Sequence, residues 1–148
     1  MKAGVVDLAG DVLVVRVGGP LRAGHEMDFD MAKYLILIYG DAQRWDAMTA
    51  EDRKELEAGH ASFSKAAGSR VLAGHELELA PMATTLRTDG VGGVTTTDGP
   101  FLEAKEAVGG YYLMEAADLD EVMGLAALLP EVHADHSGVE IRPIVDHG

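Results

Sequence analysis

The stretch YLILIY at residues 34–39 is apolar at every position, and it limits how the rest of the chain can fold. Successive side chains of a strand point to opposite faces of its sheet. A run without polar positions is therefore typical of a central strand that is buried on both sides. Gly40 and Asp41 come directly after the run and indicate where the strand ends.

Two helices are predicted further along the chain. Thr49 followed by Asp52 is a pattern typical of a helix N-terminus, and it predicts a helix over about residues 50–67. Asp118 begins a second pattern of the same kind, and the apolar stripe behind it predicts a helix that Pro130 terminates.

The remaining segments complete an α+β arrangement. Strand patterns occur at residues 71–79, at 84–87 and 94–97 around a glycine-rich turn, at 110–114 and at 139–145. This order predicts a ferredoxin-like split βαβ sheet with helices on one face and an inserted hairpin. Because helices can cover only one face, the apolar residues of the other face favour a second subunit, and we predict a homodimer packed sheet against sheet.

Residues 1–30 differ from the rest of the chain and are interpreted as an N-terminal extension of a domain at residues 31–148. Two β-branched apolar runs flank a turn that contains Asp11, which favours a hairpin. Alternatively, Met31 marks the original start of the domain. Because Asp7 and Asp11 interrupt the apolar stretch, we expect no secretory signal and a cytoplasmic location.

The composition excludes several classes of protein. Lys and Arg number 12 against 25 Asp and Glu, which gives a formal charge of -13. Such a surface repels phosphate backbones and anionic membranes, so we expect no direct binding of nucleic acid and no membrane association. The chain has no cysteine, which excludes disulfides, thiol nucleophiles and cysteine-ligated zinc.

The segment Thr97–Glu106, TDGPFLEAKE, is the most informative motif. Asp98, Gly99 and Pro100 favour a tight corner, because Asp can bond its own backbone, Gly allows unusual dihedrals and Pro fixes φ. Phe101 can anchor that corner in the core.

With this motif, the Gly-Gly-Tyr-Tyr run at 109–112 and the strand at 34–39, the chain resembles the YCII-related, DGPF-motif family over about residues 31–145. The resemblance implies a dimeric α/β-barrel type of fold. It also implies two candidate roles. One is an enzyme built on a helix-one His and a nearby Asp, and the other is a protein associated with sigma factors in transcription.

His60 on the first helix and Asp98 at the corner are the candidate catalytic pair. Histidine is well suited to proton transfer near neutral pH, and a carboxylate could orient its ring. The alternatives are a helix-surface histidine and an Asp that only shapes its turn.

Four further residues are candidate ligand contacts. Lys105 and Arg87 could hold a small anionic ligand in an otherwise acidic domain, Glu103 could line the same pocket, and Trp45 could form an apolar wall. Solvated surface positions for the charged three, and core packing for Trp45, remain alternatives.

No cofactor or designed metal site is expected. The run His-Ala-Asp-His at residues 133–136 lies in a predicted loop and lacks the helical frame of a specific zinc motif. Two hypotheses remain. One is a pocket for an unknown small molecule with His60 and Asp98 as acid and base, and the other is a non-catalytic dimer with a protein partner such as a sigma factor.

Overall fold

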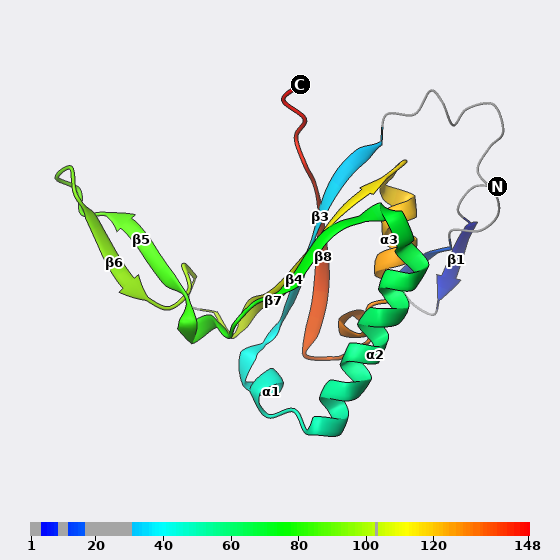
Figure 1. The fold of residues 1–148 in the computed structure, drawn as a ribbon, viewed down its shortest axis with the longest axis horizontal. Helices are drawn as coiled ribbons and strands as arrows, with labels where there is room; N and C mark the ends of the chain where they lie inside the picture. The colour runs from blue at the N-terminus through cyan, green and yellow to red at the C-terminus, as the bar shows by residue number, and fades with distance from the viewer. Residues whose placement is uncertain (1–3, 9–11, 17–30, 103) are drawn as a thin grey trace.

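The computed structural model describes residues 4–8, 12–16, 31–102 and 104–148, and its body is a four-stranded antiparallel sheet (Figure 1). The strand order is β4-β7-β3-β8. The strands are β3 (Ala32–Asp41), β4 (Val71–Glu76), β7 (Glu106–Ala116) and β8 (Ser137–Pro143). The predicted α+β class is therefore confirmed, with YLILIY in an inner strand.

Helices lie against one face of this sheet (Figure 1). They are α1 (Ala42–Asp46), α2 (Ala50–Ala67) and α3 (Leu119–Ala126), with short 3₁₀ turns η2 (Gly68–Arg70), η3 (Ala80–Met82) and η4 (Pro130–His133). The predicted cap of α2 is present, since the Thr49 hydroxyl accepts from the Asp52 N–H at 3.0 Å and the Asp52 carboxylate accepts from the Thr49 N–H at 3.2 Å. The second predicted helix is shorter than expected. It ends at Ala126, and Pro130 begins the separate turn η4.

The core lies between the helices and the sheet. Tyr34, Ile36 and Ile38 are buried on the helix side of β3, and Phe63 of α2 and Val122 of α3 are fully buried opposite them. The alternation along β3 and the apolar stripes of the helices both contribute to this single layer of contacts. This layer fixes α2 against the sheet and so positions the side chains that α2 directs toward β7.

Among the described residues, no helix lies on the other face of the sheet (Figure 1). Leu35, Leu37 and Tyr39 alternate with the buried residues of β3 and are only half-buried. Leu35 lies opposite Leu113 in the register, and Leu37 lies opposite Tyr111. We expected both faces of this strand to be buried. Within the described part of one chain, only the face toward the helices is buried.

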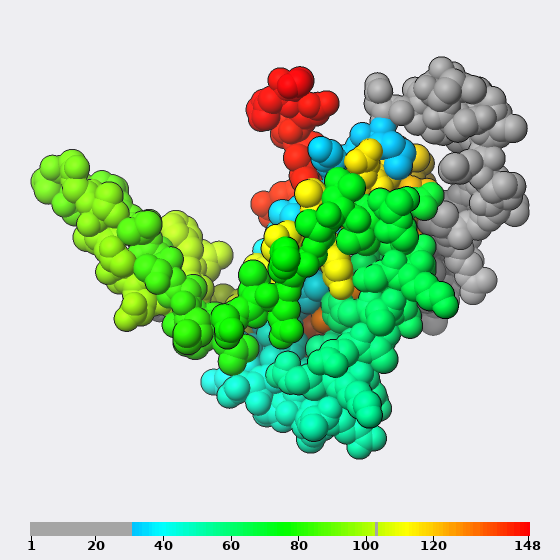
Figure 2. Space-filling model, in the orientation of Figure 1, coloured from blue at the N-terminus to red at the C-terminus, as the bar shows by residue number. Residues whose placement is uncertain are grey.

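The predicted hairpin is present as an insertion between β4 and β7, and we call residues 84–98 the arm. Strands β5 (Thr84–Thr88) and β6 (Val94–Asp98) pair antiparallel and extend away from the body (Figures 1 and 2). At the tip, Asp89 Oδ1 accepts from the N–H groups of Val91 and Gly93. Leu86 and Val94 are about two-thirds exposed, at 65% and 66%, so the arm has no core of its own.

Near the N-terminus, β1 (Gly4–Leu8) and β2 (Val12–Arg16) pair antiparallel. The turn proposed between them, at residues 9–11, lies outside the described residues. Within the described ranges, no helix combines the length and the apolar character needed to cross a membrane.

Candidate functional site

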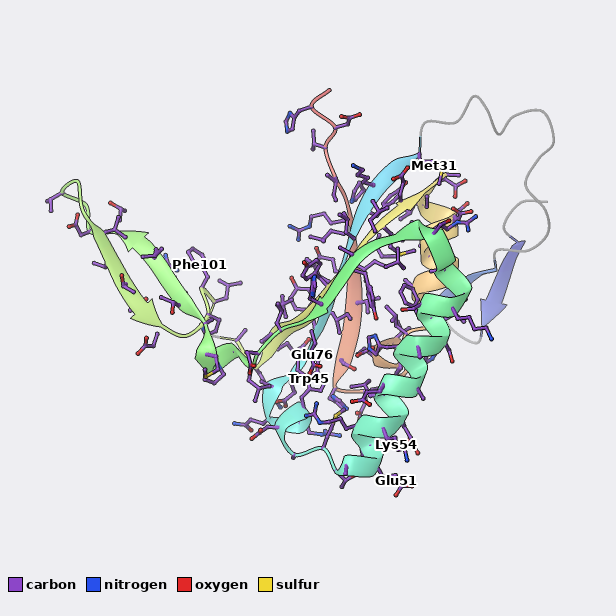
Figure 3. All side chains as sticks on the ribbon, viewed as in Figure 1. Met31, Trp45, Glu51, Lys54, Glu76 and Phe101 are labelled. Carbon is purple, nitrogen blue, oxygen red and sulfur yellow. The ribbon has the colours of Figure 1, made fainter. Side chains whose placement is uncertain are left out.

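A cavity of about 430 Å³ opens between the helices and the β4–β7 edge of the sheet. Trp45 of α1 and Leu56 of α2 line one side, and the segment that follows β4 lines the other with Leu77 and Leu79. Figure 3 shows Trp45 and Glu76 at the same end of the sheet, with Phe101 far out beside the arm. Cavities of this size and largely apolar lining commonly hold small organic ligands.

His60 lines this cavity and contacts two polar groups. Its Nδ1 lies 2.6 Å from the hydroxyl oxygen of Tyr112 on β7, and its Nε2 lies 2.7 Å from Oε2 of Glu131 in η4. All three residues line the cavity. The Glu131 side chain is only 6% exposed and that of His60 24%, so both bonds are largely shielded from water.

The positions of the protons depend on the hydrogens that each group can donate. An ionised carboxylate can only accept, so His60 Nε2–H donates to Glu131 when Glu131 is charged. With a neutral imidazole, Nδ1 then accepts the Tyr112 O–H. With a protonated imidazole, Nδ1–H donates to the Tyr112 oxygen and frees the phenolic proton for another acceptor.

Tyr112 remains protonated at neutral pH. Burial raises the pKa of Tyr112 above its ordinary value, and the charge of Glu131 raises it further, whereas a hydrogen bond with Ser64 acts in the opposite direction. The Tyr112 ring also packs against Phe63, with centroids 4.7 Å apart, which ties the hydroxyl to the core.

Glu131 is held from its backbone as well as from its side chain. Ser137 Oγ donates to the Glu131 carbonyl oxygen at 2.9 Å. The second carboxylate oxygen, Oε1, is buried and has no hydrogen-bond partner among the described residues. A buried acceptor without a partner is costly, so the bond from His60 is the main compensation for placing this carboxylate here.

Three glycines make room for the aromatic side chains of the cavity. A Cβ at Gly109 or at Gly40 would lie 2.4 Å from a Trp45 ring atom, and a Cβ at Gly74 would lie 2.4 Å from Cδ1 of Tyr112. Both rings therefore lie against bare backbone. Any larger residue at these positions would push a ring into the cavity or away from it.

The structure brings only some of the predicted site residues together. His60 and Trp45 line the cavity, but Asp98 does not. Asp98 ends β6 and pairs with Thr84 in the arm. The carboxylate that contacts His60 is Glu131, because η4 follows α3 back beneath α2 whereas the arm leads Asp98 away from it.

The predicted charged ligand contacts also lie elsewhere. Arg87 donates to the Phe101 carbonyl oxygen at 3.3 Å and places its guanidinium 3.8 Å from the centroid of the Phe101 ring. Lys105 Nζ lies 3.7 Å from Asp41 Oδ2, and its side chain is 81% exposed. Neither lines the cavity, and Glu103 lies outside the described residues.

The Asp-Gly-Pro corner forms the base of the arm. Gly99 N–H donates to the Ala83 carbonyl at 2.6 Å, and Thr85 Oγ1 donates to the Gly99 carbonyl at 2.7 Å. Gly99 has a φ of 103°, which an L side chain rarely adopts. Phe101 does not anchor the corner in the core, since it is 60% exposed.

The residues around His133 and His136 form no metal site in the part of the chain that the structure describes, where no group of three His, Cys, Asp or Glu side chains could hold an ion. His133 Nε2 instead lies 2.7 Å from the Ala127 carbonyl oxygen. Sequence reasoning missed Tyr112 as a polar partner and Glu131 altogether, since neither belongs to a recognisable motif.

Comparison with known proteins identifies the family. The model of the YCII-related domain matches residues 32–147. An uncharacterized protein of Rhizobium meliloti (strain 1021) is 29% identical over 113 residues, which cover 75% of this chain and 90% of that protein. The chain belongs to the YCII-related domain family.

Proposed function

We propose that the cavity binds a small organic molecule and that Tyr112, His60 and Glu131 move a proton to or from it. One observation carries this proposal. His60 bridges a tyrosine hydroxyl and a shielded carboxylate, at 2.6 and 2.7 Å, on the wall of the cavity. Histidine is the side chain best suited to exchange protons near neutral pH, and a carboxylate partner fixes the tautomer of its ring.

The three groups can act in both directions. With His60 protonated, Tyr112 gives its phenolic proton to the ligand and takes the Nδ1 proton in the same step, which leaves a neutral imidazole. With His60 neutral, the Tyr112 oxygen takes a proton from the ligand and passes its own proton to Nδ1. Glu131 accepts the hydrogen bond from His60 Nε2–H throughout and balances the positive charge of the ring.

Proton exchange with solvent tests this proposal directly. The protein is incubated in D₂O with enolisable ketones such as acetophenone and 2-indanone, and the loss of their C–H signals is followed by NMR. We expect exchange faster than in buffer, with a loss on the order of tenfold or more in Tyr112→Phe and in His60→Gln. His147→Gln, in the exposed tail, is the matched control. A native rate equal to that of buffer, or an undiminished rate in Tyr112→Phe, contradicts the proposal.

A second function, a non-catalytic dimeric binding protein, is favoured by a different observation. The helix-free sheet face carries Leu35, Leu37, Tyr111 and Leu113 side by side, and these side chains are half-buried in one chain. Two such faces packed together would form a dimeric α/β barrel of the ferredoxin-like type. Light scattering that gives one chain's mass at micromolar concentration would argue against this dimer.

A sigma-factor partner would require a further surface. The arm, with its exposed apolar side chains, is the part of the described chain best suited to such a contact. Copurification of a sigma factor with the native chain, and its loss with Leu86→Asp, is the outcome that this function requires.

A further inference from the structure

The charges around the cavity are unbalanced. Among the residues that line it are the carboxylates of Glu57, Glu76, Glu78 and Glu131 and the guanidinium of Arg53. Arg53 Nη1 lies 3.7 Å from Glu76 Oε2, so its charge is already met by a carboxylate. The lining therefore carries an excess of negative charge, which attracts cations and repels anions.

Among the described residues, Arg53 is the one arginine or lysine that lines the cavity and could hold a carboxylate or a phosphate. Lys105 stands near the lining residue Ala107 in the sequence, but its Nζ lies 3.7 Å from Asp41 Oδ2. Arg87 stacks on Phe101 beside the arm. Recognition of an anionic group normally uses one or more Arg or Lys donors aimed at it, and the lining offers none beyond Arg53.

The walls select for an apolar body. Apolar side chains form much of the lining, and they include Trp45, Met48, Leu56, Leu77 and Leu79. The face of an indole attracts a cation as well as an apolar group, with the interaction best developed for Trp among the aromatic residues. Both ring nitrogens of His60 are already bonded, so the Tyr112 hydroxyl is the group left to accept a hydrogen bond from a ligand, or to donate one when His60 Nδ1 is protonated.

We infer that the cavity takes a neutral or cationic molecule with an aromatic or branched aliphatic body and one amine or hydroxyl group, and that it discriminates against small carboxylates and phosphates. This inference rests on the proposed small-molecule site but not on the proton transfer. The amine or hydroxyl would lie near His60 and Tyr112, and the apolar body would lie against Trp45.

Three probes of the same shape test the selection by charge: 2-phenylethylamine, 2-phenylethanol and phenylacetate. Trp45 is the single tryptophan of the chain, so its indole N–H gives one unambiguous NMR signal inside the cavity. We expect the amine and the alcohol to shift this signal in a saturable way at pH 7. Phenylacetate should bind at least tenfold more weakly than the alcohol.

A charge variant separates the field from the shape of the cavity. Glu76 and Glu78 are exposed, so the double variant Glu76→Gln/Glu78→Gln should fold normally. In this variant the amine should bind several-fold more weakly and phenylacetate several-fold more tightly. The affinity for the alcohol should be unchanged. Glu51→Gln, an exposed change at the N-terminus of α2 outside the cavity, is the control and should alter none of the three (Figure 3).

The results have distinct meanings. Equal or tighter binding of phenylacetate, or no shift of the Trp45 signal with any probe at millimolar concentration, overturns the inference. Probes that bind in the expected order while ketone exchange is unaffected by Tyr112→Phe support the inference and count against proton transfer alone.

Discussion

The arm and the cavity differ in how their residues come together. The arm is formed by one continuous segment, and the corner at its base contains the Asp-Gly-Pro sequence that carries the family resemblance. The cavity has no continuous motif. His60, Tyr112 and Glu131 come from a helix, a strand and a 3₁₀ turn, and the packing of these elements places His60 2.6 Å from Tyr112 and 2.7 Å from Glu131.

This difference separates a motif that shapes the backbone from a site that provides chemistry. At the corner, hydrogen bonds from Gly99 and Thr85 and a positive φ account for the residue types, and nothing there requires a ligand. In the cavity, shielding the His–Glu pair from water costs desolvation free energy, and packing alone does not require such a pair. We therefore expect substitutions in the arm and in the cavity to affect different properties.

The largest contrast should come from the two described phenylalanines. Phe63 is fully buried beneath the sheet, and Phe101 is 60% exposed beside the arm. Phe63→Ala should lower the free energy of unfolding by about 3–5 kcal/mol, because it leaves a cavity in the core. Phe101→Ala should lower it by less than about 1 kcal/mol. Urea titration at low protein concentration measures both, and similar losses would contradict the contrast.

The next contrast concerns the helix-free face of the sheet. Leu37→Glu puts a charge at the middle of the proposed dimer contact, and Leu86→Glu puts one on the arm. We expect Leu37→Glu to convert the dimer to a folded monomer in sedimentation experiments, because an unpaired charge cannot be buried between two sheets. Leu86→Glu should leave the dimer intact. The reverse result would assign the contact between copies to the arm.

A smaller effect should follow from the glycines. Gly109→Ala places a methyl group 2.4 Å from the Trp45 ring, so we expect a loss of about 1–3 kcal/mol and a change in tryptophan fluorescence. Gly138→Ala is the matched control, since nothing lies within 4 Å of its added Cβ. It should change the stability by less than about 0.5 kcal/mol and leave the fluorescence unaltered. An unchanged Trp45 signal in Gly109→Ala would mean that the ring is not held by the backbone.

The sequence was sufficient to predict most helices and strands, but it predicted much less of the site. YLILIY, the Thr49–Asp52 cap and the glycine-rich turn each act through neighbours within a few residues, so periodicity and local chemistry predict them. The prediction for Phe101 is wrong because an apolar residue in a loop gives no indication of whether the loop returns to the core or leads away from it.

The partner of His60 could not have been identified in this way. Asp98 and Glu131 lie 38 and 71 residues along the chain from His60, and only the path of the backbone decides which of them reaches it. An aromatic strand pattern predicts burial of Tyr112 and does not predict that its hydroxyl meets a ring nitrogen. Trp45, a candidate for an apolar wall in the sequence, lies among the residues that line the cavity.

The smallest effects, and the most local, concern pH. Backbone N–H groups of Val91 and Gly93 lower the pKa of Asp89 at the tip of the arm, whereas burial raises the pKa of Tyr112 in the cavity. Because the pKa of Asp89 is lowered in the folded state, its ionised carboxylate stabilises the turn at pH values above the unfolded pKa of about 3.9. This contribution is lost as the pH falls through the folded pKa. A raised phenol pKa gives a contribution that is present below about 10 and is lost as pH rises through the folded value.

The two regions should therefore weaken at opposite ends of the pH scale. Between about pH 5 and 2, the amide signals of Gly90 and Gly93 should move toward unfolded positions in the native chain and should be pH-independent in Asp89→Asn. Above about pH 10, Tyr112→Phe should lose stability less steeply than the native chain, and Tyr39→Phe, on the helix-free face, serves as its control. Glycine amides in the arm that stay fixed throughout the acid range would show that the Asp89 bonds do not hold the turn. A native-like alkaline slope in Tyr112→Phe would show that ionisation of this hydroxyl is not coupled to folding, which would remove the reason for regarding it as a protonated partner of His60.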